Sequence, residues 1–205
     1  MILTLGIDSF DRDKFEVPHN SERSQFLNKP AGGLWGSTFT PNYNYVSDWA
    51  MFVFENDFAT SIYRNGIAYE LNSNARVLDV DTRYDFVKLL KNFGCLSLPG
   101  CALICSQNKR FIDWDKIVKL YDAVHFSRET VMSCRFISNE ERLDNGEVFT
   151  VSNLYSYDCE SWVVCNPDVI DMTSIRKIEM DGEGRLVKSQ LKGDGYNEAK
   201  SNKGR

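Results

Sequence analysis

The apolar residues of this chain occur in short runs separated by polar and turn-forming residues. The run from Ala50 to Phe54 is among the longest, far below the roughly 18 to 20 uninterrupted apolar residues that a membrane-spanning helix requires. Runs of this length suit short strands and amphipathic helices. Because 42% of the 205 residues are hydrophobic and 26% are charged, the chain can bury a core, which excludes disorder along its whole length.

Secondary-structure signals alternate irregularly along the chain. Runs rich in β-branched and aromatic residues predict strands over residues 2–7, 34–39, 76–80, 123–127, 161–165 and 175–180. Capping residues before apolar stripes predict helices after Ser47, after Thr82 and from Asp113 to Tyr121, whereas 135–150 is charged and irregular apart from 147–149. We therefore predict an α+β fold with small mixed or antiparallel sheets, and not a doubly wound nucleotide-binding sheet.

Composition divides the chain into a body and a tail. Residues 1–180 contain no long linker and are predicted to form a single domain, whereas residues 181–205, rich in Gly, Lys, Asn and Asp, are predicted to be a basic, mostly disordered tail. The tail carries six Lys or Arg and four Asp or Glu, so the overall charge of −5 leaves about −7 on the body. That charge argues against a broad phosphate-binding surface.

The first eight residues have no basic leader, so we expect no signal peptide, a cytoplasmic location and no membrane partner. In a reducing compartment the six cysteines are expected to be free, mostly buried thiols.

Common catalytic and metal-binding motifs are missing from the sequence. It has no GxGxxG after a strand, no GxxxxGK[ST], no HExxH and no CxxC. Cys95, Cys101 and Cys105 match no zinc module, so no metal site is expected. His125 lies inside an apolar strand and is interpreted as structural, while His19 lies in a polar loop without a nucleophile signature.

Two segments carry groups suited to ligand chemistry. In residues 28–39, glycines allow a close backbone approach, Trp35 offers a flat face, and Ser37 and Thr38 offer hydroxyls, which together suit a planar, sugar-linked ligand. In residues 157–170, Asp158 and Glu160 precede an apolar strand that would hold a carboxylate at the edge of a cleft. A turn entering a strand and an acidic loop before a core strand are the structural alternatives.

A Gly-rich turn leads into Trp-Gly-Ser-Thr-Phe, and a later acid-x-Glu step opens a strand that ends on Asn-Pro. Together, these two features resemble the ADP-ribosyltransferase fold, especially small bacterial and phage enzymes and toxins. The resemblance spans residues 28–170 and implies two small sheets around an NAD cleft. It implies that Glu160 is the catalytic glutamate, that Asp158 is the upstream acid, and that Ser37 and Thr38 belong to the strand motif that supports the pocket.

The family's first strand usually carries an Arg or His that grips NAD. The nearest substitutes in this chain are Thr4 and the Gly6 backbone. The resemblance does not assign Trp35 a role, but we expect its flat side chain to be a packing surface for the cofactor.

The resemblance implies a mono-ADP-ribosyltransferase that moves ADP-ribose from NAD, its substrate, to a macromolecular acceptor, either protein or nucleic acid. An inhibitor or antitoxin is a further expected partner. Three alternatives stay open: a catalytically inactive module that binds a partner protein, simple NAD hydrolysis, and a thiol-dependent enzyme using Cys159 or Cys165.

Overall fold

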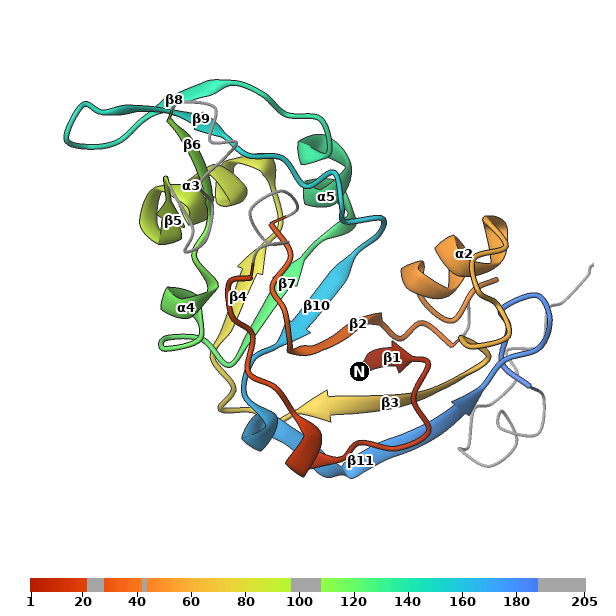
Figure 1. The fold of residues 1–205 in the computed structure, drawn as a ribbon. Helices are drawn as coiled ribbons and strands as arrows, with labels where there is room; N and C mark the ends of the chain where they lie inside the picture. The colour runs from red at the N-terminus through yellow and green to blue at the C-terminus, as the bar shows by residue number, and fades with distance from the viewer. Residues whose placement is uncertain (22–27, 42–43, 97–107, 188–205) are drawn as a thin grey trace, which may run out of the picture.

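The structure is a computed structural model that describes residues 1–21, 28–41, 44–96 and 108–187. These residues form an α+β arrangement of two mixed sheets and four α-helices (Figure 1). The α+β class agrees with the prediction from the sequence.

The larger sheet has seven strands in the order β11-β3-β1-β2-β10-β7-β4. The strands are β1 (Ile2–Leu5), β2 (Leu34–Thr38), β3 (Asn65–Leu71), β4 (Val77–Val80), β7 (Ala123–Phe126), β10 (Ser161–Val164) and β11 (Ile170–Glu179). All neighbours pair antiparallel except β4 and β7, which are parallel. This sheet is larger than the small sheets we predicted, because the long pair β3 and β11 extends it beyond β1.

The smaller sheet has the order β5-β6-β9-β8, with β5 (Gly94–Cys95), β6 (Lys109–Ile112), β8 (Glu140–Arg142) and β9 (Val148–Val151). β6 and β9 are parallel, and the other pairs are antiparallel. The hairpin of β8 and β9 occupies much of the charged segment 135–150 that the sequence pattern predicts to be irregular.

Capping explains where the four described helices begin. The Ser47 side chain accepts a hydrogen bond at the start of α2 (Asp48–Glu55), and Thr82 and Asp85 form a reciprocal capping box on α3 (Arg83–Phe93). Asp113 caps α4 (Trp114–Ile117), which is shorter than predicted because the chain turns before Tyr121. The remaining helix, α5 (Arg128–Cys134), begins at the Ser127 cap and was not predicted.

Two short 3₁₀ turns complete the described elements: η1 (Arg12–Lys14) and η2 (Pro167–Val169). η2 leads directly into β11, which starts five residues before the strand predicted over 175–180.

The main core lies between one end of the large sheet and the helices α3, α4 and α5 (Figure 1). Its fully buried side chains include Trp114, Phe126, Phe149 and Tyr157. A second cluster packs α2 against β1, and a third fills the opposite face of β1 and β3. β1 and β3 are therefore covered on both faces, and β1 in turn pairs with β2, which pairs with β10.

Residues 181–187, the first part of the segment predicted as a tail, form a turn that pairs Met180 with Leu186, and Leu186 packs against the cluster beneath α2. Residues 188–205 lie outside the described residues. Among the helices that the structure describes, none has both the length and the apolar character needed to cross a bilayer.

Candidate functional site

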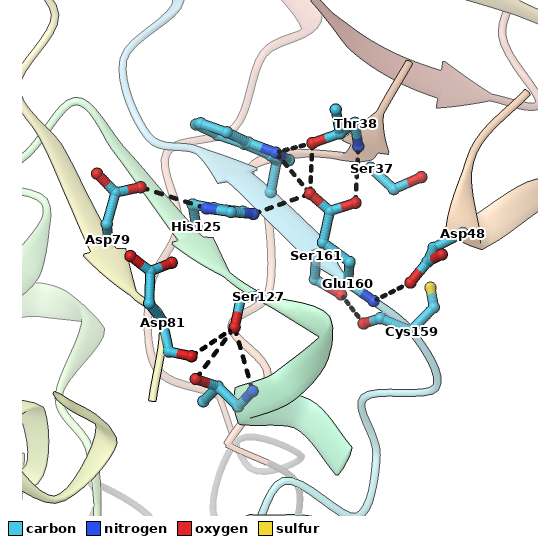
Figure 2. Close-up of polar contacts among 12 residues, drawn as sticks. Ser37, Thr38, Asp48, Asp79, Asp81, His125, Ser127, Cys159, Glu160 and Ser161 are labelled. Atoms are coloured by element: carbon cyan, nitrogen blue, oxygen red, sulfur yellow. Dashed lines mark hydrogen bonds and ion pairs between the residues drawn. The ribbon is translucent and has the colours of Figure 1, made fainter. Parts of the chain in front are cut away.

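Thr38 and Glu160 meet at the ends of two neighbouring strands. The antiparallel register of β2 and β10 pairs Trp162 with Gly36, so two residues further along Thr38 comes opposite Glu160. The side chains of Thr38 and Glu160 then point to the same side of the sheet (Figure 2). Strand pairing thus joins the two segments that the sequence analysis singled out.

The Glu160 carboxylate is mostly buried and strongly hydrogen-bonded. Its Oε1 accepts hydrogen bonds from the Thr38 hydroxyl, from His125 Nε2 at 2.8 Å and from Trp162 Nε1 at 3.2 Å. Its Oε2 accepts one, from the Thr38 backbone N–H at 2.9 Å. Because a carboxylate oxygen can accept about two hydrogen bonds, Oε2 keeps acceptor capacity for a ligand.

His125 connects Glu160 to a second carboxylate. The register aligns Asp79 of β4, His125 of β7 and Trp162 of β10 across one face of the sheet. His125 Nδ1 lies 3.2 Å from Asp79 Oδ1 (Figure 2). The His125 ring stacks on Trp162 at 4.3 Å between centroids. Since both ring nitrogens face acceptors, the arrangement favours the imidazolium form, which donates from both.

The pKa values of the pair move in the directions that stabilise both charges. Burial alone would lower the pKa of His125, but the hydrogen bonds and charges of Glu160 and Asp79 outweigh burial and raise it above 6.5. Burial alone would raise the pKa of Glu160, but the hydrogen bonds from His125 and Thr38 bring it below 4.5. The ion pair is therefore complete across mildly acidic pH.

We expect the stabilisation by this pair to depend on pH. The His125 part is fully present below pH 6.5 and is lost as the pH rises through the raised pKa; the Glu160 part is present above pH 4.5 and is lost as the pH falls through the lowered pKa. Urea unfolding of the wild type and His125→Gln should differ most between these values. A difference in unfolding free energy that stays constant up to alkaline pH would contradict the ion pair.

A cavity of about 360 Å³ opens beside Glu160. Its lining residues are Thr4, Leu5, Lys29, Pro30, Trp35, Gly36, Trp49, Tyr63, Asp158, Cys159, Glu160 and Ser161. We call it the aromatic cavity, because three aromatic side chains form its wall. It lies against the large sheet and the loop before β2, and not between the two sheets as we predicted for an NAD cleft.

Lys29 brings a positive charge into the aromatic cavity. Its Nζ lies 5.5 Å from the Trp35 ring centroid and 5.4 Å from that of Tyr157. Burial lowers the pKa of Lys29, and the negative charge of Asp158 opposes that shift in part. Within the described residues, Lys29 makes no ion pair, so the ammonium is available to an anionic ligand group.

The aromatic cavity collects four of the residues singled out from the sequence. Glu160 and Asp158 both line it, although Asp158 Oδ1 lies 3.4 Å from Arg135 Nη2 and is thus partly neutralised. Trp35 lines it while its Nε1 donates to Gly32 O at 3.1 Å. Thr4 lines it too, but its hydroxyl donates to Trp35 O at 2.7 Å, so this group serves the sheet.

Thr38, Ser37 and Gly6 lie elsewhere. Thr38 holds Glu160 and lines a neighbouring cavity. Ser37 is fully buried, and its Oγ accepts a hydrogen bond from Trp49 N at 3.2 Å. Gly6 is exposed and donates from its backbone N–H to Asn65 O at 2.8 Å, with φ of 81°, so it continues the pairing of β1 with β3 and turns the chain at the end of β1.

His125 and Lys29 are site residues that the sequence reasoning did not select. The signal for His125 was its place between Val124 and Phe126, because a polar residue between two inward-facing apolar ones points to the opposite face. Asp79, between Leu78 and Val80, shows the same pattern. No sequence pattern indicated that Lys29 belongs to the site, because its position depends on how the loop before β2 folds.

The described cysteines do not support a thiol-dependent enzyme. Cys95, Cys134, Cys159 and Cys165 are free, and the last three are buried. Burial raises the pKa of Cys165 to about 12 and raises that of Cys159 strongly. These thiols stay protonated near neutral pH and are poor nucleophiles.

Asp79, Asp81 and His125 place potential ligand atoms within 4.8 Å of one another. Nδ1 of His125 already faces Asp79 and its Nε2 faces Glu160, so ion pairing accounts for two of these three residues, Asp79 and His125.

Comparison with known proteins finds no protein-family model, no curated protein and no solved structure that matches this chain.

Proposed function

We propose that the protein transfers ADP-ribose from NAD to a macromolecular acceptor, with Glu160 as the catalytic residue. The observation that carries the proposal is a mostly buried carboxylate, held by Thr38 and His125, on the wall of a cavity with aromatic faces. The same cavity contains the ammonium group of Lys29, which makes no ion pair with the residues that the structure describes. A rigid acid and a complementary cation in one cavity suit a ligand with charge of both signs. NAD has this character, with a cationic nicotinamide ring and an anionic pyrophosphate.

Glu160 supplies the chemistry that this reaction needs. Breaking the glycosidic bond to nicotinamide develops positive charge on the ribose, as in glycoside hydrolysis. A fixed carboxylate stabilises that charge more than it stabilises the ground state. The remaining acceptor capacity of Oε2 can orient a ribose hydroxyl, while Oε1 keeps its three donors.

The aromatic cavity supplies the binding groups. Trp35, Trp49 and Tyr63 offer flat faces for a ring, and Lys29 offers a charge-assisted hydrogen bond to a phosphate. The volume of about 360 Å³ lies within the usual range of small-molecule sites.

An inactive module that binds a partner protein is the second candidate. The observation that favours it is the pairing of Glu160 with His125, since an imidazolium beside the carboxylate weakens its attraction for a developing cation. The inactive module is also favoured because the first strand has no Arg or His to bind NAD. Its nearest substitute, the Thr4 hydroxyl, already donates a hydrogen bond to Trp35 O.

Two measurements separate the candidates. An enzyme of this kind releases nicotinamide from NAD, with or without an acceptor, and NAD raises its melting temperature because the ligand binds the folded state. Millimolar NAD that gives neither nicotinamide nor a thermal shift would favour the binding module.

Lys29→Met tests whether the Lys29 ammonium contributes to NAD binding in the aromatic cavity. Methionine keeps an apolar stem over Trp35 and removes the ammonium, so folding should be preserved. We expect NAD affinity to fall about tenfold, the effect of losing one charge-assisted hydrogen bond. Equal NAD affinity in the wild type and this variant would remove Lys29 from the proposed site.

A further inference from the structure

One edge of the large sheet carries three potential metal ligands on the same face. Asp79 and Asp81 are two residues apart at the end of β4, so their side chains point to one side of the sheet, while Val80 between them faces the core. The parallel register of β4 and β7 places His125 beside Asp79. One ligand atom from each of Asp79, Asp81 and His125 lies within 4.8 Å of the other two (Figure 2).

The Asp81 carboxylate is the member of this group that ion pairing does not explain. It has no hydrogen bond and no ion pair among the residues that the structure describes. Its backbone position is nevertheless fixed, because its carbonyl accepts a hydrogen bond from Ser127 Oγ at 2.8 Å. Asp79 and Glu160 share His125 as their partner. Three carboxylates around one imidazolium leave a net negative charge, which attracts a further cation.

His125 is oriented as metal-binding histidines usually are. Its Nε2 donates to the mostly buried carboxylate of Glu160 at 2.8 Å, and its ring stacks on Trp162. A histidine that binds a metal almost always donates its second ring N–H to a carboxylate, a carbonyl or water, which fixes the ring and strengthens the other nitrogen as a ligand. The nitrogen left for a metal is Nδ1, on the side of Asp79. This orientation points to a metal ligand independently of the acidic side chains.

The spacing of these ligands suits a small divalent ion. Nδ1 of His125 lies 3.2 Å from Asp79 Oδ1, and two ligands that are each about 2.0 to 2.1 Å from a tetrahedral ion lie about 3.3 Å apart. A nitrogen ligand combined with carboxylates favours Zn²⁺ or Mn²⁺ over Ca²⁺ and Mg²⁺, which prefer oxygen ligands alone. Because the Asp79 side chain is 56% exposed, an ion can enter from solvent and keep water ligands.

We propose that Asp79, Asp81 and His125 bind one divalent transition-metal ion, Mn²⁺ or Zn²⁺, at the edge of the large sheet. The ion takes the place of the proton on His125 Nδ1, and that proton passes to water. The bound ion links β4 to β7 and holds the His125 ring against Glu160. Cysteine spacing could not indicate this site, because its ligands come from two strands 46 residues apart. Metal binding here does not require NAD, so it goes beyond the proposed reaction.

The first test counts bound Mn²⁺ by electron paramagnetic resonance, because Mn²⁺ prefers carboxylates to thiols. The wild type should bind one ion, and Asp81→Asn should weaken binding about tenfold, since the amide keeps the shape of the side chain but lacks its charge. Asp144→Asn is the matched control, because it makes the same change on the exposed turn between β8 and β9. Equal affinity in the wild type and Asp81→Asn, or no bound Mn²⁺ at millimolar concentration, would overturn the proposal. Displacement of Mn²⁺ by an equal concentration of Mg²⁺ would indicate only a negatively charged surface and would also overturn it.

The second test identifies the histidine ligand by nuclear magnetic resonance. The chain has two histidines, so the ring-proton signals can be assigned by comparison with His19→Gln. Mn²⁺ is paramagnetic, and at a concentration well below that of the protein it should broaden the His125 signals and leave the His19 signals sharp. His19 is a suitable internal control because it also lies beside a carboxylate, with Nδ1 at 3.6 Å from Glu16 Oε1. Equal broadening of both histidines would indicate unspecific binding and would overturn the assigned site.

Discussion

Glu160→Gln should lower nicotinamide release from NAD about a hundred- to a thousandfold. Loss of a group that stabilises transition-state charge typically costs about 2 to 4 kcal/mol. Glutamine keeps the size of the side chain and an acceptor for the Thr38 N–H, so the β2–β10 junction should persist. Initial rates at saturating NAD, with circular dichroism to verify folding, measure the effect.

Asp158→Asn is the matched control for this change. Asp158 lines the same aromatic cavity, but its carboxylate faces Arg135. We expect its rate to fall by less than about tenfold, since removal of a partly neutralised charge changes the field at the reacting centre less. Turnover at the wild-type level in Glu160→Gln would remove Glu160 from the mechanism, and equal losses in both variants would indicate a general effect of negative charge.

Local interactions explain why much of the helical structure could be predicted from the sequence. Ser47 bonds to Ala50, Thr82 to Asp85, and Asp113 to Lys116, each within three residues. Such contacts depend on the residues beside them in the chain and need no knowledge of the fold. α5 has the same kind of cap, Ser127 to Thr130, but its short apolar face follows a strand directly and gave a weak periodic signal.

The site depends on contacts between distant segments, so only part of it could be predicted. Glu160 and Thr38 were selected separately, but the register that joins them links residues 122 positions apart. His125 reaches Glu160 only because β7 pairs with β10, and Trp49 reaches the aromatic cavity only because α2 packs beside β2. A single sequence does not specify these pairings, because many strand orders bury the same apolar residues.

Asn28 fixes the segment that carries Lys29. It is almost fully buried, its Oδ1 accepts a hydrogen bond from Ile112 N at 3.0 Å, and its Nδ2 donates to Ser152 Oγ at 2.8 Å and to Asn153 O at 2.7 Å. Its backbone carbonyl accepts hydrogen bonds from Trp114 Nε1 and Tyr157 Oη. One residue thus ties the loop before β2 to β6 and to the segment after β9.

Asn28→Ala should therefore destabilise the fold by about 3 to 5 kcal/mol. The change leaves buried partners of the amide without hydrogen bonds, at about 1 to 3 kcal/mol each before relaxation. It also places alanine at φ of 55°, a left-handed conformation that asparagine tolerates better than alanine does, which adds up to about 1 kcal/mol. Urea unfolding followed by tryptophan fluorescence measures the loss.

Asn28→Gly separates the two causes of this loss. Glycine adopts a positive φ without strain but also lacks the amide, so it should recover about 1 kcal/mol relative to alanine and no more. If Asn28→Ala lost less than about 1 kcal/mol, the amide contacts would not hold this loop. If instead the loss is as large as expected, Asn28→Gly should also lower the affinity for NAD. Lys29 directly follows Asn28 and depends on this anchor for its position over Trp35.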